Sequence, residues 1–297
     1  MTYSYSTSQN NGQIISSADG ITGENTTYTY DALNRLTGAS NSMWNQTYTY
    51  DGFGNLLGKY GSGGSPNPVP TMSVSYDANN HQVNGYYDAN GNQTYVNEMN
   101  NGFSYENRLI SESSYYGSSA VYAYDPWGKR VMDGPDTKYN YTFYGITGQP
   151  LVRLYCDVSN YPAYPSCGLS QNVYYGNKLI VSGGVPVVTD RLGSVRANGY
   201  GESFAYYPYG EERTSTVDGR NKFGTYFRDT VGQDYADQRY YNGGMGRFWS
   251  MDPGGIKTAD PTDPGSWNRY AYVGGDPVNY YDPRGTNREE NLLRCVP

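Results

Sequence analysis

Two aspartate–proline pairs near the C-terminus are the residues of this sequence best suited to chemistry. Asp252 lies in GRFWSMDPGG and Asp282 lies thirty residues further on in NYYDPRGTN, and a glycine follows each pair. Two carboxyl groups held a few ångströms apart do not readily ionise together, so one could act as general acid while the other activates water. The simpler interpretation is two tight turns, because proline fixes the backbone and glycine permits a sharp reversal. We favour the turns, since Asp125 and Asp276 also precede proline and have no evident role.

Other residues with catalytic or metal-binding chemistry are few. The chain has one histidine, His81, and three cysteines without a Cys-x-x-Cys spacing, so we expect no metal, no cofactor and no catalytic triad. Cys156 and Cys167 could close a short disulfide loop or remain two free thiols. Arg247 and Arg269 could orient the two aspartates, although we favour an ordinary salt-bridge or stacking role for each.

The composition predicts a folded, tyrosine-rich β-structure without a thick aliphatic core. The 297 residues include 36 tyrosines, 38 glycines and 16 prolines. Tyrosine favours strands and buries its ring while its hydroxyl reaches water, and glycine and proline supply turns. A net charge of −7 without a Lys/Arg cluster argues against nucleic-acid binding, and no apolar run is long enough to span a membrane. The first residues show no signal peptide, so any export route is not visible in the sequence.

A short repeat runs through the first part of the chain. YTYDALNRLTGAS at residues 28–40 is followed by YTYDGFGNLLGKY at residues 48–60, and weaker copies continue to about residue 131. Tyr-x-Tyr puts both rings on one face of a strand, and the acidic residue with a following glycine or asparagine forms a turn. Each repeat is therefore predicted to be one β-hairpin that pairs edge to edge with its neighbours. The acidic position of the repeat is placed at Asp31, Asp51, Asp77, Asp88, Glu106 and Asp125.

The repeat resembles that of the YD-repeat proteins, also called rearrangement-hotspot (Rhs) proteins, whose repeats run Tyr-Asp-x-x-Gly-Arg-Leu. The resemblance is strongest over residues 188–285, which are similar to the Rhs repeat-associated core. VTDRLGSVRA, YYPYGEER and DQRYYNGGMGRFWSMDP match successive elements of that core, and NRYAYVGGDPVNYYDPRG matches its closing element.

The resemblance implies an all-β fold in which an array of β-hairpin YD repeats forms a curved, spiralling, shell-like sheet closed by the core. We divide the chain into the hairpin array at 1–131, an irregular continuation with the cysteine-containing loop at 132–187, the core at 188–285 and a short tail at 286–297. In this family the shell commonly holds a variable C-terminal toxin. The leading hypothesis is therefore a structural shell or cap of a secreted or surface bacterial protein that encloses or presents its own C-terminal segment or another payload.

The core of toxin-carrying members is also similar to a self-cleaving aspartyl enzyme. This similarity gives Asp252 and Asp282 a candidate catalytic role and places the cut after Thr286. Three features depart from the family: the spacing of the two aspartates is stretched, threonine replaces the usual leucine at 286, and only eleven residues follow, too few for a toxin. Self-cleavage is therefore the alternative to a purely structural role.

A third hypothesis is binding or assembly at the surface. Exposed tyrosines could hold the rings of a surface glycan, and open sheet edges could join copies of the chain into oligomers or filaments. Only the abundance of tyrosine supports this hypothesis.

Overall fold

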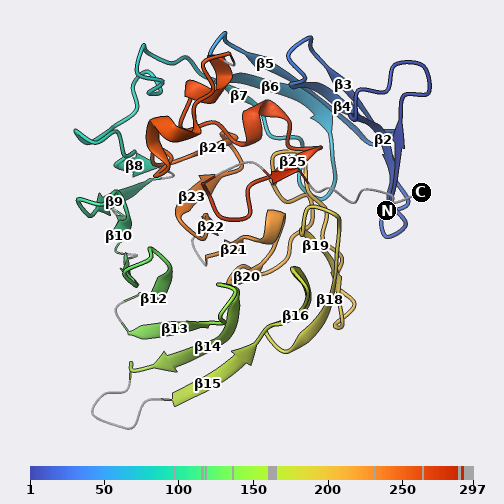
Figure 1. The fold of residues 1–297 in the computed structure, drawn as a ribbon. Coiled ribbons are helices and arrows are strands. Elements are labelled where there is room, and N and C mark those ends of the chain that lie inside the picture. Colours follow the sequence, from blue (N-terminus) through green and yellow to red (C-terminus); the bar gives the residue numbers. More distant parts are fainter. Residues whose placement is uncertain are drawn as a thin grey trace.

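The computed structural model of the chain describes residues 1–96, 98–114, 117, 119–135, 137–159, 166–229, 232–262, 264–286 and 289–290. Over these residues the regular elements are β-strands in several antiparallel sheets and short 3₁₀ helices, without an α-helix. Figure 1 shows the sheets from the earlier part of the chain arranged in an arc around the C-terminal strands, which are drawn from orange to red. The predicted all-β fold of antiparallel hairpins is confirmed.

The N-terminal sheet has seven strands, each antiparallel to the next along the chain. Its strands are β1 (Thr2–Tyr5), β2 (Ile14–Ala18), β3 (Asn25–Tyr30), β4 (Leu36–Ser40), β5 (Trp44–Tyr50), β6 (Leu56–Gly63) and β7 (Met72–Ser73). In β5, Trp44, Gln46 and Tyr48 are buried while the residues between them are exposed. This alternation follows from the period of two in a strand.

The second sheet has eight strands in the same consecutive, antiparallel order. Its strands are β8 (Tyr95–Val96), β9 (Met99–Phe103), β10 (Leu109–Ser114), β11 (Ser119–Tyr124), β12 (Arg130–Gly134), β13 (Lys138–Tyr144), β14 (Pro150–Asp157) and β15 (Ser166–Gln171). We refer to this sheet and the N-terminal sheet together as the wall.

The rest of the chain forms three smaller sheets and four 3₁₀ helices. The first sheet consists of β16 (Val173–Tyr175), β17 (Lys178–Ser182), β18 (Val185–Thr189) and β19 (Val195–Asn198). The second consists of β20 (Arg220–Asn221), β21 (Phe227–Arg228), β22 (Asp234–Ala236), β23 (Arg239–Asn242) and β24 (Arg247–Phe248), and the third of β25 (Tyr280–Tyr281) and β26 (Glu289–Glu290). The helices are η1 (Phe223–Thr225), η2 (Gly255–Thr258), η3 (Pro264–Trp267) and η4 (Val273–Gly275).

One five-residue turn recurs eleven times in the described part of the chain. The N–H of its first residue donates to the carbonyl of the fifth, and the N–H of the fourth donates to the carbonyl of the first. The fourth residue has a positive φ in every copy and is asparagine or glycine, the residues that tolerate this conformation. The turns begin at Asp31, Asp51, Asp77, Asp88, Ser104, Asp125, Gly145, Asp190, Asn198, Tyr207 and Asp229.

The side chain of the first residue explains why aspartate recurs there. Asp51 Oδ1 accepts the N–H groups of Phe53 and Asn55, both at 2.9 Å, and so satisfies two turn donors with one oxygen. The prediction that Glu106 occupies this position is wrong. Ser104 begins that turn, and its hydroxyl oxygen accepts the corresponding N–H groups, one of which belongs to Glu106 itself.

The fifth residue of a turn links that turn to the next one along the wall. Arg35 bonds Asp31 within its own turn through Nε, at 2.7 Å, and its Nη1 donates to the carbonyl of Asp51 in the following turn, also at 2.7 Å. Asn55 makes the equivalent link to the Asn80 side chain at 2.7 Å. Successive turns therefore lie side by side along one rim of the sheet.

Two details of the predicted organisation need correction. The hairpins do not form one continuous sheet, because the turns at Asp77 and Asp88 begin only eleven residues apart and leave room for isolated β-bridges alone. The segment 132–187, expected to be irregular, contains β13 to β18 in regular antiparallel pairing. Its turn at Gly145 has no side-chain acceptor, so the acidic pattern that marks the other turns is absent.

The core lies between the wall and the C-terminal strands and is largely aromatic. The main cluster joins wall residues such as Trp44 and Tyr48 to C-terminal residues such as Tyr209, Tyr241 and Tyr272. We call the chain after β19, from residue 199 onward, the C-terminal part. The wall residue Lys59, fully buried, bonds Glu211 of the C-terminal part and lies over the Tyr209 ring. The C-terminal part therefore supplies the hydrophobic surface on which the N-terminal sheet packs.

Candidate functional site

The two Asp-Pro aspartates occupy versions of the recurring turn. Asp252 follows β24, and Asp282 follows β25 directly. In each, the glycine three residues later has a positive φ and donates its N–H to the aspartate carbonyl, at 3.1 Å from Gly255 and 3.4 Å from Gly285. The Asp-Pro-x-Gly sequence is thus explained by the same backbone geometry as the repeat.

Arg239 of β23 brings the two aspartates together. Its Nη2 lies 3.4 Å from Oδ2 of Asp252 and 3.2 Å from Oδ2 of Asp282. Its Nη1 donates to the carbonyl of Arg269 at 2.9 Å, and its Nε donates to the carbonyl of Gly285. The two carboxylate oxygens can therefore lie no further apart than the sum of their two distances to Nη2. We call Arg239, Asp252 and Asp282 the dyad cluster.

The dyad cluster is buried, and its charges do not balance. Arg239 is 4% exposed, Asp252 9% and Asp282 3%. Burial lowers the pKa of the Arg239 guanidinium from its ordinary value, while Asp282 and Asp252 oppose that shift by favouring the charged form. With one guanidinium and two ionised carboxylates the cluster carries one excess negative charge, so one added proton would neutralise it. A carboxyl that holds this proton beside an ionised one has the composition of an acid–base pair.

Thr286 lies directly against this cluster. Its backbone N–H donates to Oδ1 of Asp282 at 3.0 Å, and the hydroxyl of Tyr226 holds the Asp282 carbonyl at 2.6 Å. The peptide bond after Thr286 joins it to Asn287, which lies outside the described residues. The structure therefore places the residue before the candidate cut beside one of the two carboxylates.

The arginine that contacts both aspartates is not one of the two named from the sequence. Arg247 donates to the Asn80 carbonyl at 2.7 Å and stacks over the rings of Tyr76 and Tyr270. Arg269 touches only the main chain of Asp252, where its Nη2 donates to the carbonyl at 2.7 Å. The signal for Arg239 was its place in DQRYYNGGMGRFWSMDP, the same core element that contains Asp252.

A cavity of about 890 Å³ opens beside Thr286. Strands β13 to β19 and the C-terminal part contribute to its lining, which includes Thr286 and Arg284. Many of the lining residues are aromatic or carry amides, among them Tyr144, Tyr155, Tyr174, Tyr226, Tyr235 and Tyr281. Several of its cations are already paired, as in Lys129 with Asp237 at 2.7 Å. The cavity therefore offers a polar, aromatic surface instead of a strongly charged one.

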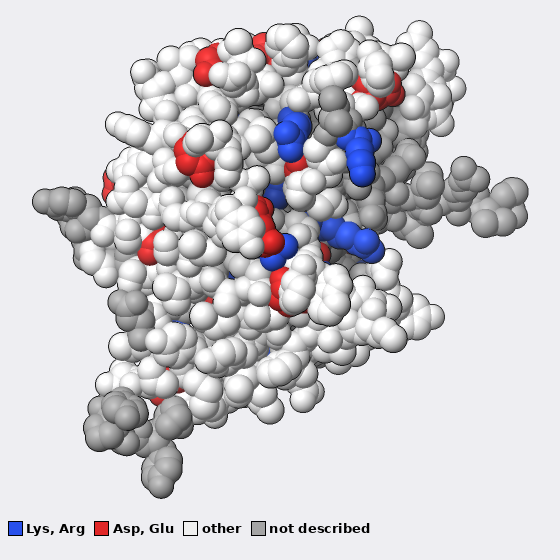
Figure 2. Space-filling view, turned by 60° about the vertical axis from the view of Figure 1, so that its left-hand side comes forward, with Lys and Arg blue, Asp and Glu red and all other residues white. Residues whose placement is uncertain are grey.

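Charged groups are largely organised in pairs across the molecule. On the face shown in Figure 2, the visible lysine and arginine side chains gather near the middle beside acidic ones. The structure shows no group of three His, Cys, Asp or Glu side chains able to hold a metal ion within its described ranges. Nor does any helix in those ranges have the length and apolar character needed to cross a membrane.

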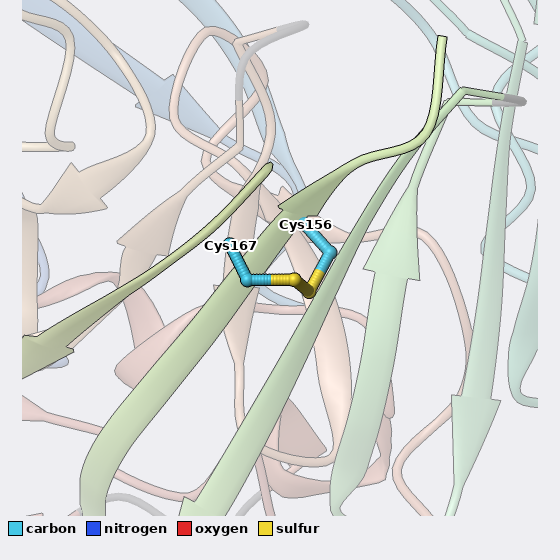
Figure 3. The surroundings of a disulfide bond; sticks show 2 residues. All are labelled: Cys156 and Cys167. Atoms are coloured by element: carbon cyan, nitrogen blue, oxygen red, sulfur yellow. A yellow bond between two sulfur atoms is a disulfide. The ribbon is translucent and has the colours of Figure 1, made fainter. Parts of the chain in front are cut away.

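Cys156 and Cys167 are joined by a disulfide (Figure 3). They lie directly opposite each other on β14 and β15, so the bond ties the last strand of the eight-stranded sheet to its neighbour. The alternative of two free thiols is not what the structure shows. Cys295 lies outside the described residues.

The RHS repeat family matches residues 10–42, which include β2 to β4 and the turn at Asp31. Residues 10–42 therefore form an RHS repeat. No curated protein matches its sequence. Several solved structures share the fold over nearly the whole chain, and their low sequence identities support a likeness of fold alone.

The first of these structures is TcdB2-TccC3-Cdc42, with a TM-score of 0.72, 21% identity and 96% of this chain covered. A second is TcdB2-TccC3 without its hypervariable C-terminal region, with a TM-score of 0.66, 20% identity and 95% of this chain covered. The third is a Photorhabdus luminescens Tc holotoxin pore with a TccC3 variant, with a TM-score of 0.61, 18% identity and 98% of this chain covered. The chain spans only 17% of the length of each of those chains.

Proposed function

We propose that this chain forms part of the wall of an RHS shell and that its cavity encloses the segment that follows Thr286. The observation that carries the proposal is the position of Thr286 and of β26, which follows it. Thr286 lines the cavity, and β26 (Glu289–Glu290) pairs with β25, whose Tyr281 is also part of the lining. The segment leaving the core therefore starts at the cavity.

The chemistry of the lining supports an enclosed polypeptide. Tyrosine hydroxyls and side-chain amides can both donate and accept, so they can contact an extended chain without a fixed sequence. Strands β13 to β19 and the C-terminal part both line the cavity, and the arc of sheets in Figure 1 supports a curved wall. The fold shared with TcdB2-TccC3, one structure of which lacks a hypervariable C-terminal region, supports the same arrangement.

The location and the assembly of the protein form part of the same proposal. We expect a secreted or surface bacterial protein, because a fold match belongs to a Tc holotoxin pore of Photorhabdus luminescens. Strand β1 is at the edge of its sheet, with Thr2, Ser4 and Tyr5 exposed, so this edge could pair with further repeats or a second copy. Glycan binding stays a prediction without a specific site.

The thiol of Cys295 provides a test of enclosure, because Cys156 and Cys167 form the disulfide and leave Cys295 as the one remaining cysteine of the sequence. We expect this thiol to react with a maleimide more slowly in the native protein than in urea. A matched control is the double variant Cys295→Ser, Asn90→Cys, because Asn90 is exposed at the tip of the turn that begins at Asp88. Equal native rates for the two proteins would contradict enclosure.

A second candidate function, self-cleavage after Thr286, is favoured by the dyad cluster. We propose that one ionised carboxylate takes a proton from water as the water oxygen bonds the Thr286 carbonyl carbon. The protonated carboxyl of the pair then gives its proton to the departing nitrogen of Asn287, and the C–N bond breaks. The contacts of Asp252 and Asp282 with one arginine, and of Thr286 with Asp282, support this reaction.

Intact-mass measurement over days of incubation tests self-cleavage. The wild type is expected to lose the mass of the last eleven residues, whereas Asp252→Asn and Asp282→Asn stay full-length. Asp260→Asn is the matched control, because Asp260 also precedes proline but is exposed, and its described bonds go to the nearby Thr262, Ser266 and Trp267. A wild-type chain that persists as long as Asp282→Asn rules out cleavage while leaving the enclosure proposal standing.

A further inference from the structure

Glu112 is a buried carboxyl at the junction between the wall and the C-terminal part. It lies on β10, is 1% exposed, and is far from the dyad cluster in sequence. Its Oε2 accepts hydrogen bonds from the Tyr122 hydroxyl on β11 and from the Gln233 side chain. Gln233 ends the turn that begins at Asp229 and also donates to Tyr122, at 3.1 Å. One carboxyl oxygen therefore ties two wall strands to the C-terminal part.

The other oxygen of Glu112 has no partner among the described residues. Its Oε1 is buried without a hydrogen bond, while Oε2 already accepts two. A buried ionised carboxylate with an unpaired oxygen is costly, and a proton on that oxygen removes the charge. Part of the surroundings is apolar, since Leu109 and Trp249 belong to the same buried cluster as Tyr122.

The charged groups around Glu112 balance only when it is neutral. The two acids Asp133 and Asp229 are matched by two arginines: Arg130 bonds Asp229 at 2.8 Å and Arg153 bonds Asp133 at 2.6 Å. An ionised Glu112 adds an excess negative charge to this set. Burial raises the pKa of Glu112 from 4.5 to about 7. The Tyr122 hydrogen bond and Arg130 oppose that rise, and Asp229 adds to it.

We propose that Glu112 is a proton-controlled latch that holds the wall strands β10 and β11 against the segment carrying Gln233. With its proton on Oε1 the carboxyl is neutral and the junction is closed. Loss of that proton leaves an unpaired charge between the two parts, and the junction loosens. The junction is thus held closed in mildly acidic surroundings and opens more readily in alkaline ones.

The direction of the pH dependence follows from the linkage between protonation and folding. A carboxyl whose pKa is higher in the folded protein contributes stability that is complete below its ordinary value of 4.5 and lost as pH rises through about 7. We expect hydrogen-exchange protection of β10 and β11 amides to fall on the order of a hundredfold across this window. Protection of β16 and β17, where no described contact reaches Glu112 or Asp276, should not share the fall.

The variant Glu112→Gln separates the latch from other titrating groups, because it keeps a neutral side chain at every pH. We expect its β10 and β11 protection to match the wild type at low pH and to remain level as pH rises. Asp276, whose pKa burial raises to about 6, titrates in both proteins and therefore cancels in the comparison. Glu106→Gln is the matched control, since its side chain is 47% exposed and its loss should leave the wild-type profile unchanged.

If Glu112→Gln does not fold, hydrogen exchange of the wild type alone still tests the proposal. Its β10 and β11 protection must then fall relative to β16 and β17 as pH rises. A wild-type profile that is level across the window overturns the latch. So does a Glu112→Gln protein whose protection falls in parallel with the wild type.

Discussion

Replacing Arg239 with methionine is expected to lower the free energy of unfolding by about 3–5 kcal/mol, as measured by urea denaturation. The guanidinium contacts Asp252, Asp282 and two backbone carbonyls in a buried setting. Methionine preserves much of the packing over Phe248, where the guanidinium carbon lies 3.6 Å from the ring centre. What remains is two buried carboxylates without their cation, and this accounts for the size of the loss.

A rescue variant separates the effect of the unpaired charges on stability from the effect of lost packing. Adding Asp252→Asn and Asp282→Asn to Arg239→Met removes the unpaired charges, so a substantial part of the lost stability should return. A loss below about 1 kcal/mol, or none of the rescue, would show that the three side chains are not a buried cluster.

Replacing Tyr241 with alanine is expected to cost about 3–5 kcal/mol in the same measurement. Its ring is 0% exposed and packs against Phe223, Tyr226, Phe248 and Tyr272 at centroid distances of 4.5 to 6.3 Å. The variant creates a cavity where the C-terminal part meets the N-terminal wall. Its hydroxyl also donates to the Tyr209 carbonyl at 2.8 Å.

Two variants calibrate this prediction. Tyr241→Phe removes only the hydroxyl and should cost about 1 kcal/mol. Tyr105→Ala, at a turn tip where the side chain is 89% exposed, should change stability by less than about 0.5 kcal/mol. If Tyr105→Ala and Tyr241→Ala proved equally harmful, the aromatic cluster would not be the core that holds the two parts together.

The local structure of the wall could be predicted from the sequence because it depends on short-range contacts. At Asp31 and Asp51 an aspartate meets the N–H groups two and four residues later, and an asparagine or glycine with positive φ completes the turn. The same reasoning failed where a residue other than aspartate begins the turn. Ser104 accepts the turn N–H groups through a hydroxyl, and Gly145 begins a turn through its backbone alone.

Long-range contacts explain what the sequence did not reveal at the candidate site. The Asp-Pro-x-Gly pattern identified both aspartates, because each turn is local. Arg239 contacts partners thirteen and forty-three residues away, so no local spacing connects it to them. The contact of Glu112 with Gln233 spans 121 residues, and its burial depends on strands from both halves of the chain.

The central claim is that the wall encloses the segment after Thr286. Its most direct test is the reactivity of the Cys295 thiol with reagents of increasing size. We expect a small alkylating reagent to react slowly with Cys295 in the native protein. A bulky polyethylene-glycol maleimide should react at a rate at least roughly tenfold lower still, until urea opens the shell. The exposed Asn90→Cys control should show no such dependence on native structure. Native Cys295 that reacts with the bulky reagent as fast as the control would contradict enclosure.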